Sequence, residues 1–440
     1  MMYFLTELLM LVSILLIGLA LRYLPHIHYY FPGTSDMFYH FSKIRDPSYG
    51  EEEMMYPPLF HWFFRIFRRR DGSLPERSLT FLTPLSDIGT ALIFYLFLHG
   101  TFGIEFALMA VLIFLVTPTV VIQGITFSPR PIGLLFVVSS LLCLTFPFPF
   151  NFLAMIPIAL TLLTHRLATQ TLFFISLGLT FFNWQVGFVF LGGVGLALLL
   201  SRGQFSKSLQ SHLAFIKRYI TGTKYPNRRL LGIFLAPTLL GLIGYLAIHL
   251  LSTIFPFPIV FIGEIISELP IVYPHIETIF LIWSSICLLL LIFWLAGESY
   301  RYTYYACVPF AFFCVFLIQS SSLFLIAVVI LIGLCVAVSI FFSTRIQHLD
   351  RDVVTLLRYL SRNNNRVYFL VPYHLLRAAK YFSQKEGTYV IFTETTIEKV
   401  ATQIESEKIT HVVVNHSHLN WFPKLIQIKQ CGDWYLLQSP

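Results

Sequence analysis

Long apolar runs alternate with polar connections over the first 342 residues of this 440-residue chain. A helix needs roughly 17–25 mostly apolar residues to cross the hydrocarbon core of a bilayer. The pattern therefore predicts an α-helical polytopic membrane protein with about eleven transmembrane helices. The expected helices cover residues 3–24, 79–99, 104–123, 131–148, 149–164, 167–183, 184–200, 230–252, 278–297, 303–319 and 321–342.

The pattern changes at about residue 345. Short β-branched and aromatic runs then alternate with stretches of helical character, which predicts a small parallel α/β domain. The expected strands are 367–371, 389–392, 411–414 and a final one at 434–437, and the expected helices are 374–384 and 395–408. We therefore expect a transmembrane domain over residues 1–344 and a soluble α/β tail over residues 345–440.

Composition supports a membrane protein and narrows its partners. Only 12% of the residues are charged, whereas soluble proteins have roughly 25%. The net charge is +8, which by itself also fits a protein that binds nucleic acid. In a membrane protein, however, lysines and arginines at helix ends meet anionic headgroups or phosphate. We therefore expect membrane lipids as partners and no nucleic acid.

The connection after the first apolar run, residues 25–78, contains the first candidate site residues. Asp36 and His40 lie one helical turn apart in it. A carboxylate beside a membrane helix is costly to hold near lipid and commonly has a function. Asp36 and His40 are therefore candidate catalytic residues. The alternative is that Asp36 belongs to a turn after Gly33 and that His40 only packs on the same short helix.

A topology with a cytoplasmic amino terminus and eleven crossings brings the ionisable residues at the helix edges to one side. These residues are Asp36, His40, Asp87, Arg130, His165, Arg166, Glu298 and Arg301. Scattered structural charges need only local partners and do not segregate in this way. The pattern therefore predicts a shared polar cavity at the outer face, in which one or two carboxylates lie among several cations.

The distribution of basic loops favours a different topology. Residues 201–230 contain seven Lys or Arg and no acidic residue, so the positive-inside rule places them in the cytoplasm. That would follow if 167–183 and 184–200 formed one tilted or re-entrant element. Arg301 and the tail would then be cytoplasmic, unless residues 253–277 contain a further crossing. We keep eleven crossings because they gather the polar residues, and because a basic outer loop helps to seat an anionic lipid.

Cations around a carboxylate at an outer membrane face suit the use of a lipid phosphate. Arginine binds phosphate bidentately and stabilises its charge, and a carboxylate can accept the proton of a hydroxyl group. The candidate phosphate-binding residues are Arg130, His165, Arg166 and Arg301. Two acidic residues are expected to support them. Glu298 can pair with Arg301, and Asp87 lies where it can cap the second helix.

Several of these motifs, in their order along the chain, resemble the GT-C superfamily of membrane glycosyltransferases. This superfamily includes protein O-mannosyltransferases, aminoarabinose transferases and oligosaccharyltransferase catalytic subunits. The matching pieces are Asp36-Met37-Phe38-Tyr39-His40, Tyr56-Pro57-Pro58, Ser128-Pro129-Arg130-Pro131 and Glu298-Ser299-Tyr300-Arg301-Tyr302 followed by Pro309. The resemblance implies that Asp36 is the catalytic base and that Arg301 or Arg130 holds the phosphate of a polyprenyl-linked sugar donor.

The resemblance is incomplete in ways that bear on cofactors. The WWDYG motif of oligosaccharyltransferases is absent, and no acidic pair occurs near Arg130, where those enzymes place a second metal-binding group. No cysteine pair has metal-binding spacing either. We therefore expect no metal or other cofactor, and an inverting single-sugar transferase rather than an enzyme that glycosylates asparagine.

The sequence leaves the acceptor and two rival functions open. The acceptor is a glycan, a lipid or a protein, and the expected location is the plasma membrane. The rivals are a transporter or flippase for a lipid-linked or anionic solute, and a non-catalytic assembly subunit. A transporter predicts broken helices at mid-membrane and two related halves. The sequence has no clear halves and no charges in the middle of the expected spans.

Overall fold

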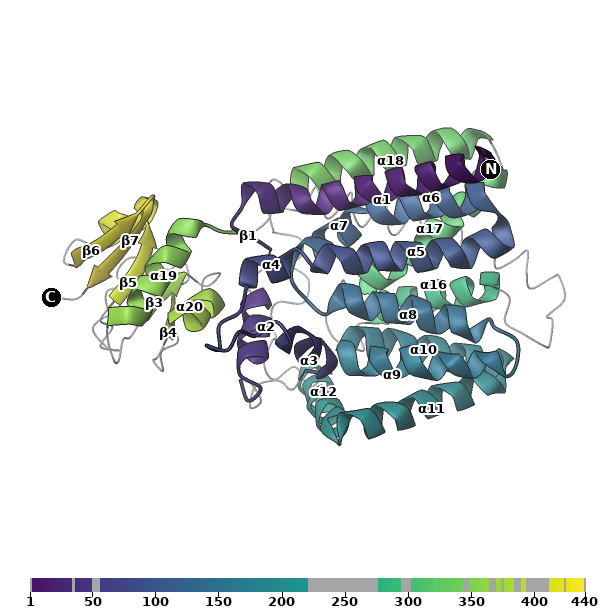
Figure 1. Ribbon diagram of the computed structural model, residues 1–440, viewed down its shortest axis with the longest axis horizontal. Helices are drawn as coiled ribbons and strands as arrows, with labels where there is room; N and C mark the ends of the chain where they lie inside the picture. The colour runs from purple at the N-terminus through teal and green to yellow at the C-terminus, as the bar shows by residue number, and fades with distance from the viewer. Residues whose placement is uncertain are drawn as a thin grey trace.

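The computed structural model describes two parts of the chain. The first consists of residues 2–33, 36–49, 56–220, 276–293, 302–320 and 322–343, and the second of 348–363, 369–372, 376–383, 389–392, 411–422 and 425–438. The first part is a bundle of apolar helices, and the second is a smaller α/β unit at one end of that bundle (Figure 1).

Helices lie at ten of the eleven positions expected from hydropathy, and the eleventh, 230–252, lies outside the described residues. The bundle consists of α1 (Met2–His28), α5 (Thr83–Phe102), α6 (Ile104–Val116), α7 (Pro118–Ile125), α8 (Arg130–Leu144), η1 (Phe150–Ala154), α9 (Met155–Thr164), α10 (Arg166–Phe182), α11 (Trp184–Ser201), α16 (Ile276–Phe293), α17 (Thr303–Ser320) and α18 (Ser322–Ser343). Three described helical segments, within α1, α4–α5 and α11, are each long and apolar enough to cross a bilayer. The bent pair α6–α7 makes a fourth if it counts as one span.

The expected single helix over 104–123 is wrong. The chain bends by 59° between α6 and α7. The residue at the bend, Thr117, has an extended backbone (φ −59°, ψ 123°). It precedes Pro118, and a residue before proline is disfavoured in the α-helical region. The bend shortens the span and turns α7 into a separate short helix that leads to the start of α8.

Residues 167–183 and 184–200 form two helices, α10 (Arg166–Phe182) and α11 (Trp184–Ser201), and not one continuous tilted helix. Asn183 has an extended backbone, and its side chain accepts a hydrogen bond from the backbone N–H of Gln185, two residues further on. Asn183 therefore caps a new helix after α10 has ended. Figure 1 shows α10 and α11 as two separate helices in the bundle.

Among the described residues of the first part, four helices lie outside the bundle, at the end where the α/β unit is found (Figure 1). They are α2 (Asp36–Arg45), α3 (Leu59–Arg65), α4 (Glu76–Thr80) and α12 (Gln204–Ile220). The basic connection that contains α12 is therefore at the same end as the first loop, as the eleven-crossing topology predicts. Helix α3 and the turn after it expose Phe63, Ile66 and Phe67, which is typical of a segment at a membrane interface.

The tail contains a five-stranded sheet with the order β4-β3-β5-β7-β6. Its elements are β2 (His348–Leu349), α19 (Arg351–Asn363), β3 (Phe369–Pro372), α20 (Leu376–Ser383), β4 (Tyr389–Phe392), β5 (His411–Asn415), η4 (His416–Trp421), β6 (Ile426–Cys431) and β7 (Trp434–Gln438). Strand β3 is parallel to β4 and β5, as the alternating pattern predicts, whereas β6 and β7 form an antiparallel hairpin whose first strand was not expected. The expected helix at 395–408 lies outside the described residues.

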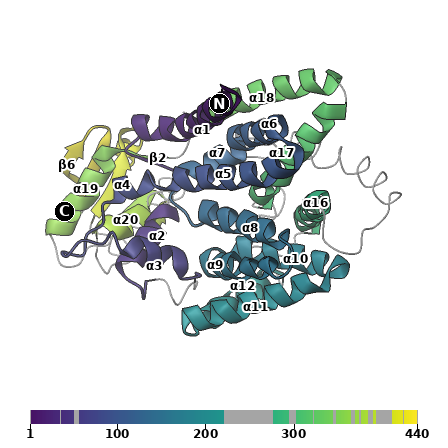
Figure 2. The same ribbon diagram turned by 45° about the vertical axis from the view of Figure 1, so that its right-hand side comes forward.

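The tail packs tightly on the first loop. Strand β1 (Phe31–Pro32) pairs antiparallel with β2, and α20 lies against α2 (Figure 2). One apolar core contains side chains from both parts, among them Phe31, Phe38, Phe41, Tyr381 and Phe382. The loop and the tail therefore bury a common set of aromatic side chains. A domain boundary at residue 345 stays a prediction.

Candidate functional site

A cavity of about 160 Å³ lies at the end of the bundle near the tail. It is lined by Asp36, His40, Tyr56, Ile122, Gln123, Thr126, Ser128, Pro129, Arg130 and His165. These residues come from the first loop, from α7 and the turn after it, and from the starts of α8 and α10. Four of the residues chosen from sequence, Asp36, His40, Arg130 and His165, therefore meet at one cavity.

Asp36 is the first residue of α2, and Gly33 lies three residues before it. Gly33 has a φ of +111°, which side chains rarely allow, and a Cβ atom there would come within 2.7 Å of the Thr126 hydroxyl oxygen. Glycine therefore lets the loop approach the wall of the cavity. The Asp36 Oδ1 atom accepts a hydrogen bond from Nη1 of Arg377, a residue of α20 in the tail.

His40 lies one turn after Asp36 and pairs with a second histidine. The His40 Nδ1 and His61 Nε2 atoms are 3.1 Å apart, and both rings are almost completely buried. Burial lowers the pKa of His40 to about 3, with smaller contributions from the nearby charges of Arg377 and Arg130. Burial also lowers the pKa of His61 well below its usual value. The pair is therefore uncharged at neutral pH, and Nε2 is the His40 nitrogen that remains for a ligand.

Arg130 is held at the cavity wall by the proline turn that starts α8. Its Nη1 atom donates a hydrogen bond to the Gln123 side-chain oxygen. Pro129 and Pro131 flank it, and Pro131 occupies the first turn of the helix, where no backbone N–H is needed. The guanidinium group therefore starts from a rigid position between α7 and α8.

His165 is fixed between two helices. It is the residue before α10, and its Nδ1 atom lies 2.9 Å from the Tyr305 hydroxyl of α17. Gly133 of α8 makes room for it, because a Cβ at that position would lie 3.2 Å from the Cβ of His165. The ring is thus positioned by three helices that are distant in sequence.

Arg166 lies beside the cavity and does not line it. Its guanidinium group stacks over the Tyr56 ring at 5.2 Å, and Nη2 donates to the Ser211 hydroxyl of α12 over 3.3 Å. Tyr56 lines the cavity and stands between it and Arg166. Arg166 therefore supports the wall, together with the basic helix α12.

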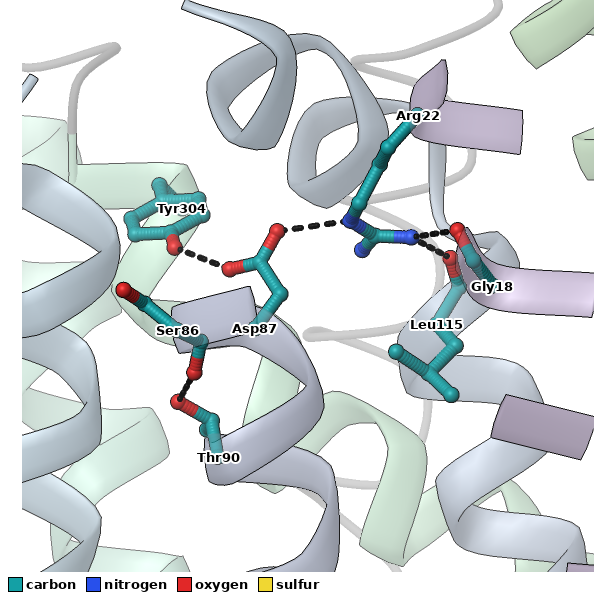
Figure 3. Close-up of polar contacts among 7 residues, drawn as sticks. All are labelled: Gly18, Arg22, Ser86, Asp87, Thr90, Leu115 and Tyr304. Atoms are coloured by element: carbon teal, nitrogen blue, oxygen red, sulfur yellow. Dashed lines mark hydrogen bonds and ion pairs between the residues drawn. The ribbon is translucent and has the colours of Figure 1, made fainter. Parts of the chain in front are cut away.

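The structure does not bring Asp87 to the cavity. Its Oδ2 atom lies 2.7 Å from Nε of Arg22 on α1, and both side chains are fully buried. Figure 3 shows this pair with the Tyr304 hydroxyl, which donates to Oδ1 over 3.0 Å. Asp87 is not the cap of α5, because it lies inside the helix, after Thr83 and Pro84. Glu298 and Arg301 lie outside the described residues.

Gln123 and Arg377 are among the polar residues at the site that were not chosen from sequence. Gln123 lies in a run that otherwise reads as a plain apolar span, and its only sequence signal is an amide seven residues before Arg130. Arg377 lies in the tail, 341 residues from its partner, and nothing near it in the sequence indicates that partner.

Metal binding finds no support in the parts of the chain that the structure describes. No group of three His, Cys, Asp or Glu side chains there is arranged to hold a metal ion. Asp36 has an arginine as its ion-pair partner, and the two cavity histidines, His40 and His165, bond to His61 and Tyr305. These contacts leave Oδ2 of Asp36 and Nε2 of His40 available, so the expected absence of a metal stays a prediction.

No protein-family model and no curated protein matches the chain. Solved structures do match. The oligosaccharyltransferase of Archaeoglobus fulgidus in its apo form aligns with a TM-score of 0.63 and 12% identity, over 94% of this chain and 70% of that one. ArnT from Cupriavidus metallidurans bound to undecaprenyl phosphate aligns with a TM-score of 0.60 and 11% identity, over 99% of this chain and 97% of that one. The chain has the GT-C fold.

A further matching structure also contains a lipid phosphate. The archaeal oligosaccharyltransferase AglB from Archaeoglobus fulgidus, in complex with an inhibitory peptide and a dolichol-phosphate, aligns with a TM-score of 0.59 and 12% identity, over 94% of this chain and 69% of that one. The resemblance expected from the order of the motifs is therefore confirmed for the fold. At such low identity the likeness does not extend to substrate or residue roles.

Proposed function

We propose that this protein is a membrane glycosyltransferase that moves a sugar from a polyprenyl-phosphate-linked donor to an acceptor hydroxyl. The observation that supports it best is the convergence of Asp36, Arg130 and His165 at one cavity. These residues come from elements far apart in the sequence. A carboxylate and a guanidinium that face one space provide a base and an anion-binding group, the two functions that such a transfer needs.

Arg130 is the group proposed to bind the donor phosphate. It lies at the start of α8, at the end of the apolar bundle, which is where a lipid phosphate would be found. Its guanidinium can bind two phosphate oxygens at once. His165, also at the cavity, would bind a further oxygen, and Arg166 with α12 would add positive charge behind the wall. The structures with dolichol-phosphate and undecaprenyl phosphate agree with this class of lipid.

Asp36 is the proposed base. The acceptor oxygen forms a bond to the anomeric carbon while the bond from that carbon to the phosphate oxygen breaks, and the electron pair of that bond leaves with the phosphate. The acceptor proton passes to Asp36. Attack from the face opposite the phosphate inverts the anomeric centre, and Arg130 stabilises the charge on the leaving phosphate. The leaving oxygen needs no proton from a strong acid, so one carboxylate suffices.

The proposed setting is a multi-pass protein of the plasma membrane with its site on the outer face. The first loop, the tail and α12 lie at one end of the bundle, in agreement with the eleven-crossing topology. The proposed acceptor is a glycan, a lipid or a protein, and no metal takes part. A transporter or flippase for a lipid-linked solute is the rival to be tested.

An Asp36→Asn variant tests the proposal, with Asp46→Asn as its matched control. Asp46 follows the same helix, and its side chain accepts hydrogen bonds from the backbone N–H and the hydroxyl of Ser48. In membranes supplied with a labelled polyprenyl-phosphate sugar, Asp36→Asn should lose transfer by at least about 100-fold and still bind donor, whereas Asp46→Asn should keep both. Transfer by Asp36→Asn at the control rate would overturn the assignment. Donor translocation without any transfer by the wild type would favour the transporter.

A further inference from the structure

The tail contributes a residue to the site, and its placement rests on an extensive contact surface. Helix α20 lies on α2 through aromatic side chains: the Phe382 and Phe38 ring centroids are 5.3 Å apart, and the Tyr381 and Phe41 centroids 5.8 Å. The Arg45 guanidinium stacks over the Tyr381 ring at 4.6 Å. Buried aromatic pairs of this kind fix the relative position of two helices.

Two further contacts hold α20 in place. The Tyr381 hydroxyl donates to Oε1 of Glu76 on α4 over 2.8 Å. The β1–β2 pairing joins the tail to the chain just before α2. Arg377 lies four residues before Tyr381, so both project from the same face of α20. The packing that holds Tyr381 on α2 therefore brings Arg377 to the first turn of α2, where Asp36 lies.

The contact that results engages only one oxygen of the carboxylate. Arg377 Nη1 donates to Oδ1 of Asp36, and the Arg377 guanidinium also lies 5.8 Å from the centre of the Tyr39 ring. Oδ2 accepts no hydrogen bond from the described residues. Asp36 also lines the cavity, so the contact leaves one oxygen of the carboxylate for a ligand there.

We propose that Arg377 is a positioning residue of the active site, which holds Asp36 so that Oδ2 is directed to the acceptor hydroxyl. This inference rests on the proposed function. Both side chains are about 45% exposed, and exposed ion pairs contribute little to stability. The effect of Arg377 is therefore on the orientation of the base, and the fold persists without it. The site is incomplete without the tail.

Arg358 provides a matched control on the neighbouring helix α19. Its Nη2 atom lies 3.7 Å from Oε2 of Glu76, its guanidinium stacks over the Phe382 ring at 5.1 Å, and it is 47% exposed. Like Arg377, it is a half-exposed tail arginine that pairs with a carboxylate of the first loop. Neither arginine lines the cavity, and the difference between them is the partner: Arg377 contacts Asp36, whereas Arg358 contacts Glu76. A loss of tail docking would affect both arginine variants, whereas a loss of positioning would affect only Arg377.

The kinetic test compares Arg377→Met, Arg377→Lys and Arg358→Met in sugar transfer. Arg377→Met should lower kcat about 10- to 100-fold, because misplacement of a reacting group by about 1 Å costs this much, with KM for the lipid donor within about two-fold. Arg377→Lys should recover part of the loss, since lysine keeps the charge. Arg358→Met should match the wild type. Equal kinetics for the two Met variants would overturn the inference.

A second readout does not need transferase activity. Carbodiimide labelling of Asp36 at one fixed pH, followed by peptide mass spectrometry, should be about two- to five-fold faster in Arg377→Met, as expected for loss of one exposed ion pair. In Arg358→Met the labelling of Asp36 should stay unchanged. If the wild type transfers no sugar, the proposed function fails, and a labelling change confined to Arg377→Met would still support the pairing. Unchanged labelling in Arg377→Met would contradict it.

Discussion

Arg22 of α1 and Asp87 of α5 form an ion pair inside the helical bundle, with 2.7 Å between Nε and Oδ2 and no exposure of either side chain. The Arg22 guanidinium also donates to the backbone oxygens of Gly18 and Leu115, and Tyr304 donates to the second carboxylate oxygen (Figure 3). Gly124 of α7 lies so close that a Cβ there would meet both charged groups. The hydrogen bonds of the pair therefore join α1, α5, α6 and α17, and α7 packs against it.

Removing one member of this pair should strongly destabilise the protein. Arg22→Met or Asp87→Asn leaves the remaining charged group buried without its counter-charge, which typically costs about 3–5 kcal/mol. The double variant Arg22→Met/Asp87→Leu should recover much of that loss, because no charge remains unpaired. Thermal denaturation of the purified protein in one detergent would measure the three changes.

His99→Gln is the matched control for the buried pair. His99 lies 3.2 Å from Glu7, so this pair also joins α5 to α1, but it is partly exposed. Its loss should shift the midpoint much less, because exposed pairs contribute about 0–1 kcal/mol. A double variant less stable than either single variant would contradict this prediction. It would show that the two residues stabilise the protein by something other than the pairing of their charges.

The sequence predicted the convergence of Asp36, Arg130 and His165 because Asp36 lies in the connection after the first apolar run and the other two lie at the edges of later runs. Crossing parity alone then assigns all three to one face. The positions of the helices followed from hydropathy, because each helix of the bundle coincides with a long apolar run. Pro118 is a sequence signal for the bend at Thr117. The bend was not predicted because the apolar run continues across it.

The partners of Asp36 and Asp87 were not predictable in this way. The Asp36–Arg377 contact depends on how α20 packs on α2, which is a tertiary event without a local signal. Arg22 was not considered because it lies at the end of an apolar run, where arginine is common. For Asp87, the N-cap preference of aspartate pointed to a local role, whereas its partners lie 65 and 217 residues away.

The buried histidine pair should make the first loop less stable at acidic pH. The pKa of His40 in the folded protein is lowered to about 3 from the usual 6.5. Below pH 6.5 the unfolded loop therefore binds a proton that the folded loop does not, so stability falls as pH falls towards 3 and is constant above 6.5. His61, whose pKa is also lowered, adds a contribution of the same sign.

Hydrogen exchange of α2 and α3, corrected for the intrinsic rate, would measure this dependence. Opening should become easier by at most about 1.4 kcal/mol per pH unit for each histidine between pH 6.5 and 5. A His61→Gln variant, which cannot titrate at that position, should show a weaker dependence. A loop whose opening is insensitive to pH over this range would mean that the pair is already accessible to protons in the folded state.

Arg130 and Arg166 should differ in their effect on donor binding. Arg130 lines the cavity, whereas Arg166 lies behind Tyr56. Arg130→Met should raise KM for the polyprenyl-phosphate sugar by roughly 10- to 100-fold, the value of a charge-assisted hydrogen bond to phosphate. Arg166→Met should raise it by only a few-fold. Steady-state kinetics over a range of donor concentrations would separate the two, and a larger effect of Arg166→Met would assign the phosphate to the α12 side.

Gly133 should be important for the position of His165. A Cβ at this position of α8 would lie 3.0 Å from the Cβ of Ala168, 3.2 Å from that of His165 and 3.5 Å from the Tyr305 hydroxyl. The first two distances are too short for ordinary contact, and both atoms are close to the backbone, so α10 has to move. Gly133→Ala should therefore displace His165 and lower kcat/KM about 10-fold or more, at a cost in stability of about 1–3 kcal/mol.

Gly195→Ala is the control for this substitution. Gly195 also lies within an apolar helix, α11, but no atom comes within 4 Å of a Cβ built there. Alanine at that position should be neutral or slightly stabilising, because it favours the helix over glycine by up to about 1 kcal/mol. If Gly133→Ala kept full activity while the control behaved as expected, α8 and α10 would have room to separate. His165 would then not depend on their close approach.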